Sequence, residues 1–239
     1  NPYVIKINPS EKSQLHTLLN YVTQDSINQR IVVLTNDSIP QEKLRSDYVK
    51  LYFETLRPYD SMPVFFDISK EKFNQFQTLL SHKNDHAIVY LSDNEVFVTE
   101  VLANISKREN SSNVLYCLQK LSQFEFTELL YLNDLQTHYA EAFFVDHQRE
   151  DVKNFELLFF ETYQTIPDQY AYVGYDVVRY VLQLLKLGNS NYERYLETMP
   201  YQGFHNTVRL YRQDSTQGLE NHETNILKIQ SSQLIKVNN

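Results

Sequence analysis

The sequence has 239 residues and a formal net charge of −8 at pH 7, and 42% of its residues are hydrophobic. A chain of this length and composition can bury a full core, in one domain or in two lobes, and it is not typical of disordered proteins. The acidic balance argues against a nucleic-acid partner, because that affinity depends on neutralising phosphates with Lys and Arg.

Helices and strands alternate over the first 145 residues. A helical stripe begins after Ser10, a natural N-cap, and Pro40 opens a second helix with Leu44, Tyr48, Leu51 and Thr55 on one side. Three further helices are predicted around residues 73–80, 94–105 and 126–132. The predicted strands are 31–35, 63–68, 87–91, 114–118 and 139–145. Because these strands are apolar throughout, the sequence predicts an α/β fold of three layers, with a mostly parallel sheet and helices on both faces.

Residues 151–188 predict two amphipathic helices joined by a short break. In the first, apolar side chains recur every three or four residues, from Val152 to Tyr163. Pro167 marks the break, and Gly188 is a plausible C-terminal cap of the second helix. Asp176 is expected to favour the positive N-terminus of that helix rather than acid–base work.

The last fifty residues predict a closing set of strands. A polar, Tyr-rich segment covers 189–202. Residues 207–212 and 226–229 then alternate apolar and polar side chains, as half-exposed strands do. A third short run, 234–237, could pair with them, which gives antiparallel strands at the C-terminus.

Polar residues follow the predicted strands at their carboxyl ends, where open α/β sheets bind ligands. The candidate ligand-binding residues are Asn36, Asp37, Ser38, Ser92, Asp93, Asn94 and Gln119, with Lys120 beside the last. Their side chains and the amides of the following helix starts suit a carboxylate or another polar ligand. The alternative is that Asp37, Ser38, Ser92 and Asp93 only cap helices.

Other kinds of site find no support in the sequence. All four glycines lie after residue 173, so no phosphate-binding glycine loop is present and no cofactor is expected. The single cysteine, Cys117, excludes an internal disulfide and fits a buried apolar strand. No two histidines have metal-ligand spacing on a helix, and no serine has the glycines of a nucleophile elbow, so neither metal binding nor catalysis is expected.

The sequence contains no recognisable membrane or leader segment. No apolar run approaches the roughly 20 residues of a membrane helix, so no membrane insertion is expected. Asn1 is not an initiator methionine, and we therefore expect a mature product or an excised fragment.

Several motifs together resemble the type I periplasmic binding proteins, the bilobed α/β receptors of amino-acid uptake. Phe155, Pro167-Asp168 and Gly174-Tyr175-Asp176 are similar to the C-terminal signature of these receptors. Residues 1–14 resemble the segment that enters their second lobe, and Gly203-Phe204 with the last strands resembles their closing hairpin. The run from Leu135 to Asp176 is similar to a cell-envelope subgroup, in which a peptidoglycan-binding LysM region precedes a receptor-like domain.

This resemblance implies three ranges and a non-catalytic binding function. Residues 1–150 would form an α/β domain like the second lobe, 151–200 a helical return of the first lobe, and 201–239 closing strands packed on the α/β domain. The N-terminal part of the first lobe would be missing. The expected role is a receptor-like domain of the periplasm or cell envelope that binds a small, amino-acid-like ligand or a peptidoglycan fragment. The alternatives are a structural or protein-interaction domain without a ligand site and, less favoured, a hydrolase.

The missing first lobe has a consequence for the helices of 151–187. Without it their apolar faces would be exposed, which proteins avoid. We expect these faces to fold onto the remaining sheet, to be covered in a homodimer, or to meet a further lobe.

Overall fold

The computed structural model describes residues 1, 3–26, 29–56, 62–70, 73–80, 85–105, 113–118, 129–212, 214, 216–231 and 233–238. The chain divides into two compact units, and each is described by itself. Unit 1 is Asn1–Gln14 with Glu141–Asn225, and unit 2 is Leu15–Ala140 with Ile226–Asn239. These bounds differ from the predicted ranges 1–150, 151–200 and 201–239, because the chain passes from one unit to the other three times.

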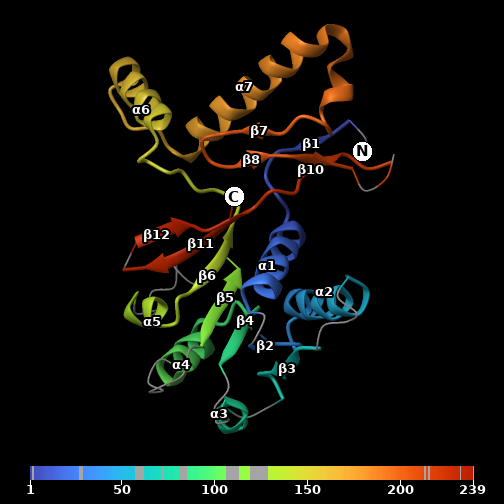
Figure 1. The fold of residues 1–239 in the computed structure, drawn as a ribbon, viewed down its shortest axis with the longest axis vertical. Coiled ribbons are helices and arrows are strands. Elements are labelled where there is room, and N and C mark those ends of the chain that lie inside the picture. Colours follow the sequence, from blue (N-terminus) through green and yellow to red (C-terminus); the bar gives the residue numbers. More distant parts are fainter. Residues whose placement is uncertain are drawn as a thin grey trace. The chain divides into compact units, whose positions relative to one another are not determined.

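Unit 2 is built around a seven-stranded sheet (Figure 1). The strand order is β12 (Gln233–Lys236), β11 (Asn225–Gln230), β6 (His138–Glu141), β5 (Val114–Leu118), β4 (His86–Tyr90), β2 (Arg30–Thr35) and β3 (Val64–Asp67). The five strands from β6 to β3 are parallel, and β11 pairs with β12 in the antiparallel sense. The prediction of a mostly parallel sheet with antiparallel closing strands is therefore confirmed.

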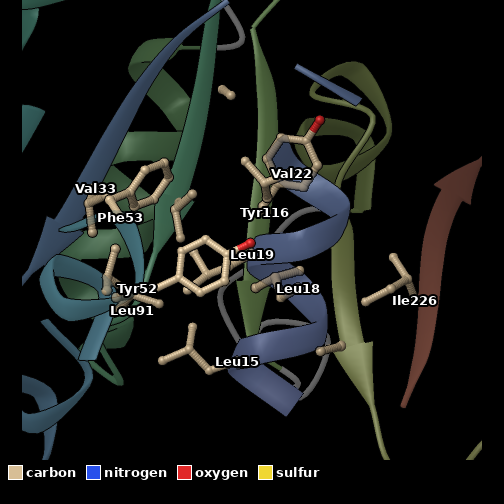
Figure 2. Packing of buried hydrophobic residues seen from close by; sticks show 14 residues of the cluster. Leu15, Leu18, Leu19, Val22, Val33, Tyr52, Phe53, Leu91, Tyr116 and Ile226 are labelled. Atoms are coloured by element: carbon tan, nitrogen blue, oxygen red, sulfur yellow. The ribbon is translucent and has the colours of Figure 1, made fainter. Parts of the chain in front are cut away.

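Five helices among the described residues flank this sheet. They are α1 (Glu11–Asp25), α2 (Pro40–Leu56), α3 (Phe73–Leu80), α4 (Glu95–Ile105) and α5 (Leu129–Asp134). The Ser10 hydroxyl accepts the Ser13 N–H at 3.2 Å, which confirms it as the N-cap of α1. Figure 2 shows the predicted α1 stripe, Leu15, Leu18, Leu19 and Val22, packed against Val33, Phe53, Tyr116 and Ile226.

Helix α2 does not bury the side that carries Leu44 and Leu51. Leu44 and Leu51 are more than half exposed. The buried residues of the helix are Glu42, Arg45, Ser46, Val49, Tyr52 and Phe53. The predicted helix is present, but the row of Leu44 and Leu51 is not the side that it buries, because charged residues of α2 find polar partners inside unit 2.

The described residues of unit 1 form two α-helices, one 3-10 helix and two small sheets. Its helices are α6 (Glu150–Tyr163), α7 (Gln169–Gly188) and the 3-10 helix η2 (Asn189–Tyr195). One sheet has the order β1 (Ile5–Lys6), β10 (Leu219–Asn221) and β9 (Leu210–Tyr211), and the other pairs β7 (Tyr201–Gln202) with β8 (Thr207–Val208). The predicted strand 207–212 is thus two short strands, and the predicted strand 139–145 ends at Glu141.

The predicted break around Pro167 separates α6 from α7. Gln164 adopts the left-handed conformation, with φ of 56°, and its N–H donates to the Phe160 carbonyl at 2.8 Å, which ends α6. The Asp168 carboxylate then accepts the Ala171 N–H at 2.9 Å and caps α7. Gly188 is the last residue of α7 and not a cap beyond it, because the chain continues directly into η2.

The two signature segments of unit 1 meet at the Asp176 carboxylate. Asp176 is 1% exposed and accepts the Phe204 N–H at 2.8 Å, the His205 N–H at 3.1 Å and a hydrogen bond with His205 Nδ1 at 2.5 Å. It lies in the second turn of α7, so the prediction that it favours the helix N-terminus is wrong. Its physical role is to fix the turn between β7 and β8.

Gly203 is required at this turn by a close approach. A Cβ at this position would lie 2.5 Å from Asp176 Oδ2 and 2.7 Å from the Asn206 carbonyl oxygen. Both oxygens are held by hydrogen bonds, since Asn206 O accepts the Gly203 N–H at 3.0 Å. Around the turn, Phe204 stacks on Tyr175 with ring centroids 4.7 Å apart. Tyr175, Asp176, Gly203 and Phe204, which resemble a family signature, therefore contact one another in unit 1.

Candidate functional site

Six of the predicted site residues follow β2 and β4, which are neighbours in the sheet of unit 2. The register pairs Leu34 with Tyr90, and the Leu91 N–H donates to the Leu34 carbonyl at 3.0 Å. Residues 36–38 and 92–94 therefore lie on one edge of the sheet, which we call the carboxyl edge. Gln119 and Lys120 lie outside the described residues. That these residues bind a ligand stays a prediction.

After β2, the polar side chains form a local turn. Asn36 Oδ1 accepts the Ser38 N–H at 3.2 Å and the Ser38 hydroxyl at 2.5 Å. The Thr35 hydroxyl donates to Asp37 Oδ1 at 3.0 Å. Asn36 is buried, whereas Asp37 is half-buried. The turn thus leaves the Asp37 carboxylate partly accessible to solvent.

Asp67 joins the carboxyl edge from β3, a residue that the sequence analysis did not select. The register pairs it with Thr35, and its Oδ1 accepts the Asp37 N–H at 3.2 Å. Burial raises the pKa of Asp67, but hydrogen bonds from Lys70 and Ser69 outweigh burial and lower the pKa to about 2. Asp67 is therefore a fixed negative charge at neutral pH.

After β4, the side chains satisfy the start of α4. Asn94 Oδ1 accepts the Phe97 N–H at 3.1 Å, as an N-cap does. Ser92 Oγ accepts the Asn94 N–H at 3.1 Å, and the Tyr90 hydroxyl donates to the Asn94 carbonyl at 2.8 Å. Burial raises the pKa of Tyr90 above its ordinary value, so this hydroxyl remains a donor. Asn94 therefore caps α4, and Ser92 holds the turn that precedes the helix.

Two charged residues of α2 complete the carboxyl edge, and sequence reasoning missed both. Arg45 is 5% exposed and donates to the Leu91 carbonyl at 2.9 Å, and it forms an ion pair with Asp93 at 3.1 Å. Glu42 Oε1 accepts the Asp93 N–H at 2.9 Å. The spacing of Glu42 and Arg45, three residues apart on one helix face, could have indicated a shared polar environment. Their partners Leu91 and Asp93, however, lie about fifty residues further along the sequence.

The backbone amides of the carboxyl edge already have acceptors inside the protein. The N–H groups of Asp37, Ser38, Asp93 and Asn94 donate to Asp67, Asn36, Glu42 and Ser92. These amides are therefore not available to a ligand carboxylate. Among the described residues of the edge, the carboxylates of Asp37, Asp67, Asp93 and Glu42 outnumber the cations Arg45 and Lys70, and this surplus of acceptors suits a group that donates hydrogen bonds.

Three further features of the described residues bear on the kind of site. Among them, no group of three or more His, Cys, Asp and Glu could hold a metal ion. Cys117 is buried, and burial raises the pKa of its thiol, as expected of an unreactive cysteine. In the described part of the chain, no helix is both long and apolar enough to cross a membrane.

No protein-family model matches the sequence, and no curated protein is similar enough in sequence to match it. Solved structures, in contrast, match nearly the whole chain. An ABC transporter substrate-binding protein from Desulfitobacterium hafniense, solved in complex with Leu, is 16% identical with a TM-score of 0.62, and the match covers 98% of this chain and 68% of that one. A branched-chain amino-acid ABC transporter periplasmic ligand-binding protein from Burkholderia xenovorans is 11% identical with a TM-score of 0.64, covering 100% and 65%.

A third similar structure is described as a regulator rather than a transport protein. The C-domain of LpoA from Haemophilus influenzae, described as a regulator of PBP1A, is 10% identical with a TM-score of 0.56, and the match covers 96% of this chain and 67% of that one. This chain spans about two thirds of the length of each of these proteins. At these identities the likeness establishes the fold. The chain therefore has the fold of the type I periplasmic binding proteins, as its signature residues predicted.

Proposed function

We propose that this chain is a non-catalytic, receptor-like binding module of the periplasm or cell envelope. Its ligand is small and polar, either amino-acid-like or a peptidoglycan fragment. One observation supports this most: residues from three adjacent strands and α2 bring Asp37, Asp67, Asp93 and Arg45 to one edge of the sheet. The fold supports it too, since similar structures include proteins described as substrate-binding or ligand-binding.

The charges at the carboxyl edge favour recognition of a ligand ammonium or hydroxyl group. The side chain of Asp37 is half-buried, and its backbone N–H already donates to Asp67. Glu42 Oε2 is buried and has no hydrogen-bond partner among the described residues. Acceptors are thus in excess over donors. A ligand carboxylate would need donors from outside this group of residues.

Thermal-shift measurements with matched ligands test this function. A ligand at 100 times its Kd stabilises the native state by about 2.7 kcal/mol, which raises the Tm of a chain of this size by roughly 5–10 °C. Leucine amide keeps the ammonium group and loses the carboxylate, whereas N-acetyl-leucine does the reverse. We expect stabilisation by the amide and none by the acetylated form. Peptidoglycan fragments are screened alongside.

A variant assigns the effect to the carboxyl edge. Asp37→Asn should abolish the Tm shift. Asp47→Asn is the control and should leave the Tm shift unchanged. The Asp47 carboxylate is exposed on α2 and has only a weak ion pair with Lys50, at 3.6 Å. A shift that survives Asp37→Asn would place the ligand elsewhere.

The second candidate is a protein-interaction domain that has the fold without a small ligand. The occupied amides favour it, because each has an internal acceptor. The LpoA C-domain, described as a regulator, has a similar structure. Absence of stabilisation by every amino acid and peptidoglycan fragment would favour this candidate over the first.

A further inference from the structure

The four carboxylates of the carboxyl edge differ in their partners. Two of them have a cation beside them, in the ion pairs Arg45–Asp93 at 3.1 Å and Lys70–Asp67 at 2.6 Å. Asp37 and Glu42 form no such ion pair with any described residue, and each uses only one of its two oxygens for hydrogen bonds to described residues. These two carboxylates are therefore the ones left for a cationic ligand to neutralise.

Glu42 has a buried oxygen that waits for a donor. Its side chain is 1% exposed. Its Oε1 accepts the Asp93 N–H at 2.9 Å, so the carboxylate reaches the carboxyl edge. Its Oε2 is buried and accepts no hydrogen bond from the described part of the chain. Burying a carboxylate oxygen without a donor is costly, and native proteins rarely do so.

The Ser46 hydroxyl lies one turn further along the same face of α2. Residues four apart on a helix are neighbours, and Ser46 is also 1% exposed. Its Oγ is buried and has no hydrogen-bond partner among the described residues. Glu42 Oε2 and Ser46 Oγ thus offer two acceptors on one helix face. An ammonium group, which has three N–H donors, suits both of them at once.

Asp37 provides a second negative charge, in the turn that precedes α2. Its side chain is half-buried, and only its Oδ1 accepts a hydrogen bond from a described residue, the Thr35 hydroxyl at 3.0 Å. The N-terminus of α2 offsets part of the charge of Asp37 and Glu42, because a helix end carries about half of a positive charge. The excess that remains is roughly one and a half negative charges, more than a single ammonium group neutralises.

We propose that the ligand of the carboxyl edge carries two cationic groups, as a diamino acid or a diamine does. Asp37 pairs with one ammonium group, and Glu42 with Ser46 holds the second. This inference rests on the proposed function and restricts its small polar ligand to a dication. Because Glu42 is covered in the structure, the ligand reaches it only after neighbouring side chains shift. That of Asp93, whose N–H contacts Glu42, is 38% exposed.

Isothermal titration calorimetry with matched ligands tests the second charge. Lysine amide carries two ammonium groups, whereas norleucine amide has the same backbone and only one. We expect lysine amide to bind about tenfold more tightly, the effect of one additional ion pair. Equal affinities would overturn the dication and leave the proposed function standing. If neither compound binds, and leucine amide does not bind either, the proposed function fails and the dication fails with it.

Glu42→Gln assigns the second charge to a residue. Glutamine keeps an oxygen for the Asp93 N–H but carries no charge. We expect lysine amide to fall to the affinity of norleucine amide, which should itself stay unchanged. Glu54→Gln, which changes an exposed carboxylate on the same helix, is the control and should preserve the tenfold difference.

Ser46→Ala is a second variant that the fold should tolerate. It removes a buried hydroxyl that has no partner among the described residues, so no hydrogen bond within that part of the chain is lost. We expect it to weaken lysine amide by roughly fivefold, the effect of one hydrogen bond to a charged group, and to leave norleucine amide unchanged. An undiminished preference for lysine amide in folded Glu42→Gln or in Ser46→Ala would overturn the proposal.

Discussion

Adding one methyl group at Gly203 should destabilise unit 1 strongly, whereas the same change at Gly174 should not. At Gly203 the new Cβ would lie 2.5 Å from Asp176 Oδ2 and 2.7 Å from the Asn206 carbonyl oxygen. At Gly174 it would meet no atom within 4 Å. The two substitutions are chemically identical, so the difference between them reports the local geometry alone.

The loss of stability expected for Gly203→Ala follows from the two groups that the new methyl group would displace, the Asp176 carboxylate and the Asn206 carbonyl. Asp176 holds the Phe204 and His205 amides, and the Asn206 carbonyl holds the Gly203 N–H. Overpacking costs about 1–3 kcal/mol, and each displaced buried hydrogen bond costs about 1 kcal/mol more. We expect Gly203→Ala to lower the free energy of unfolding of unit 1 by about 3–5 kcal/mol.

Gly174→Ala serves as the matched control. Alanine has a higher helix propensity than glycine, so this change should stabilise α7 by about 0.5–1 kcal/mol. Urea unfolding at a concentration that keeps the protein monomeric measures both effects. Tyrosine fluorescence can follow it, because the chain has 18 tyrosines and no tryptophan. Equal changes for the two variants would refute the close approach at Gly203.

Three further predictions concern buried polar groups. Arg45→Ala should destabilise unit 2 by about 2–3 kcal/mol. Loss of a fully buried ion pair would cost more, but the side chain of Asp93 is 38% exposed. A loss below about 0.5 kcal/mol in urea unfolding would mean that water replaces the ion pair at little cost. Burial, helped by the nearby Lys228, lowers the pKa of His138 from 6.5 to about 4. Between pH 6.5 and 4 the imidazole of His138 therefore binds a proton in the unfolded chain but not in the folded chain, and the free energy of unfolding should fall by about 3 kcal/mol over this range. His138→Gln should make the free energy of unfolding depend less on pH. An unchanged pH dependence in this variant would assign the effect to other groups. Asp176→Asn should speed amide hydrogen exchange in the turn after Gly203, and unchanged protection there would show that the carboxylate does not hold the turn.

The parallel sheet was predictable because its strands are continuous apolar runs. The predicted strand 31–35 lies within the observed Arg30–Thr35, and 114–118 is the same in both. Strands β1, β7 and β10 were not predicted. They have two or three residues each, too few for a recognisable alternation of apolar and polar side chains. The pairing of β1 with β10 also joins residues far apart in sequence, such as Ile5 and Leu219.

The buried face of α2 could not be read from hydrophobicity. Leu44 is 64% exposed and Arg45 is buried, because the carbonyl of Leu91 and the carboxylate of Asp93 accept from its guanidinium. The same limit applied to the candidate site. The sequence places Asp37 and Asp93 at strand ends, but it does not show that Asp67 and Glu42 occupy their amides.

An NMR titration of the carboxyl edge tests the proposed binding function most directly. Amide chemical shifts of the labelled chain are recorded as leucine amide, amino acids and peptidoglycan fragments are added. We expect saturable shift changes centred on residues 36–38 and 92–94, with the amides of 203–206 unaffected. Shift changes confined to other residues, or none with any of these compounds, would contradict a ligand site at this edge of the sheet.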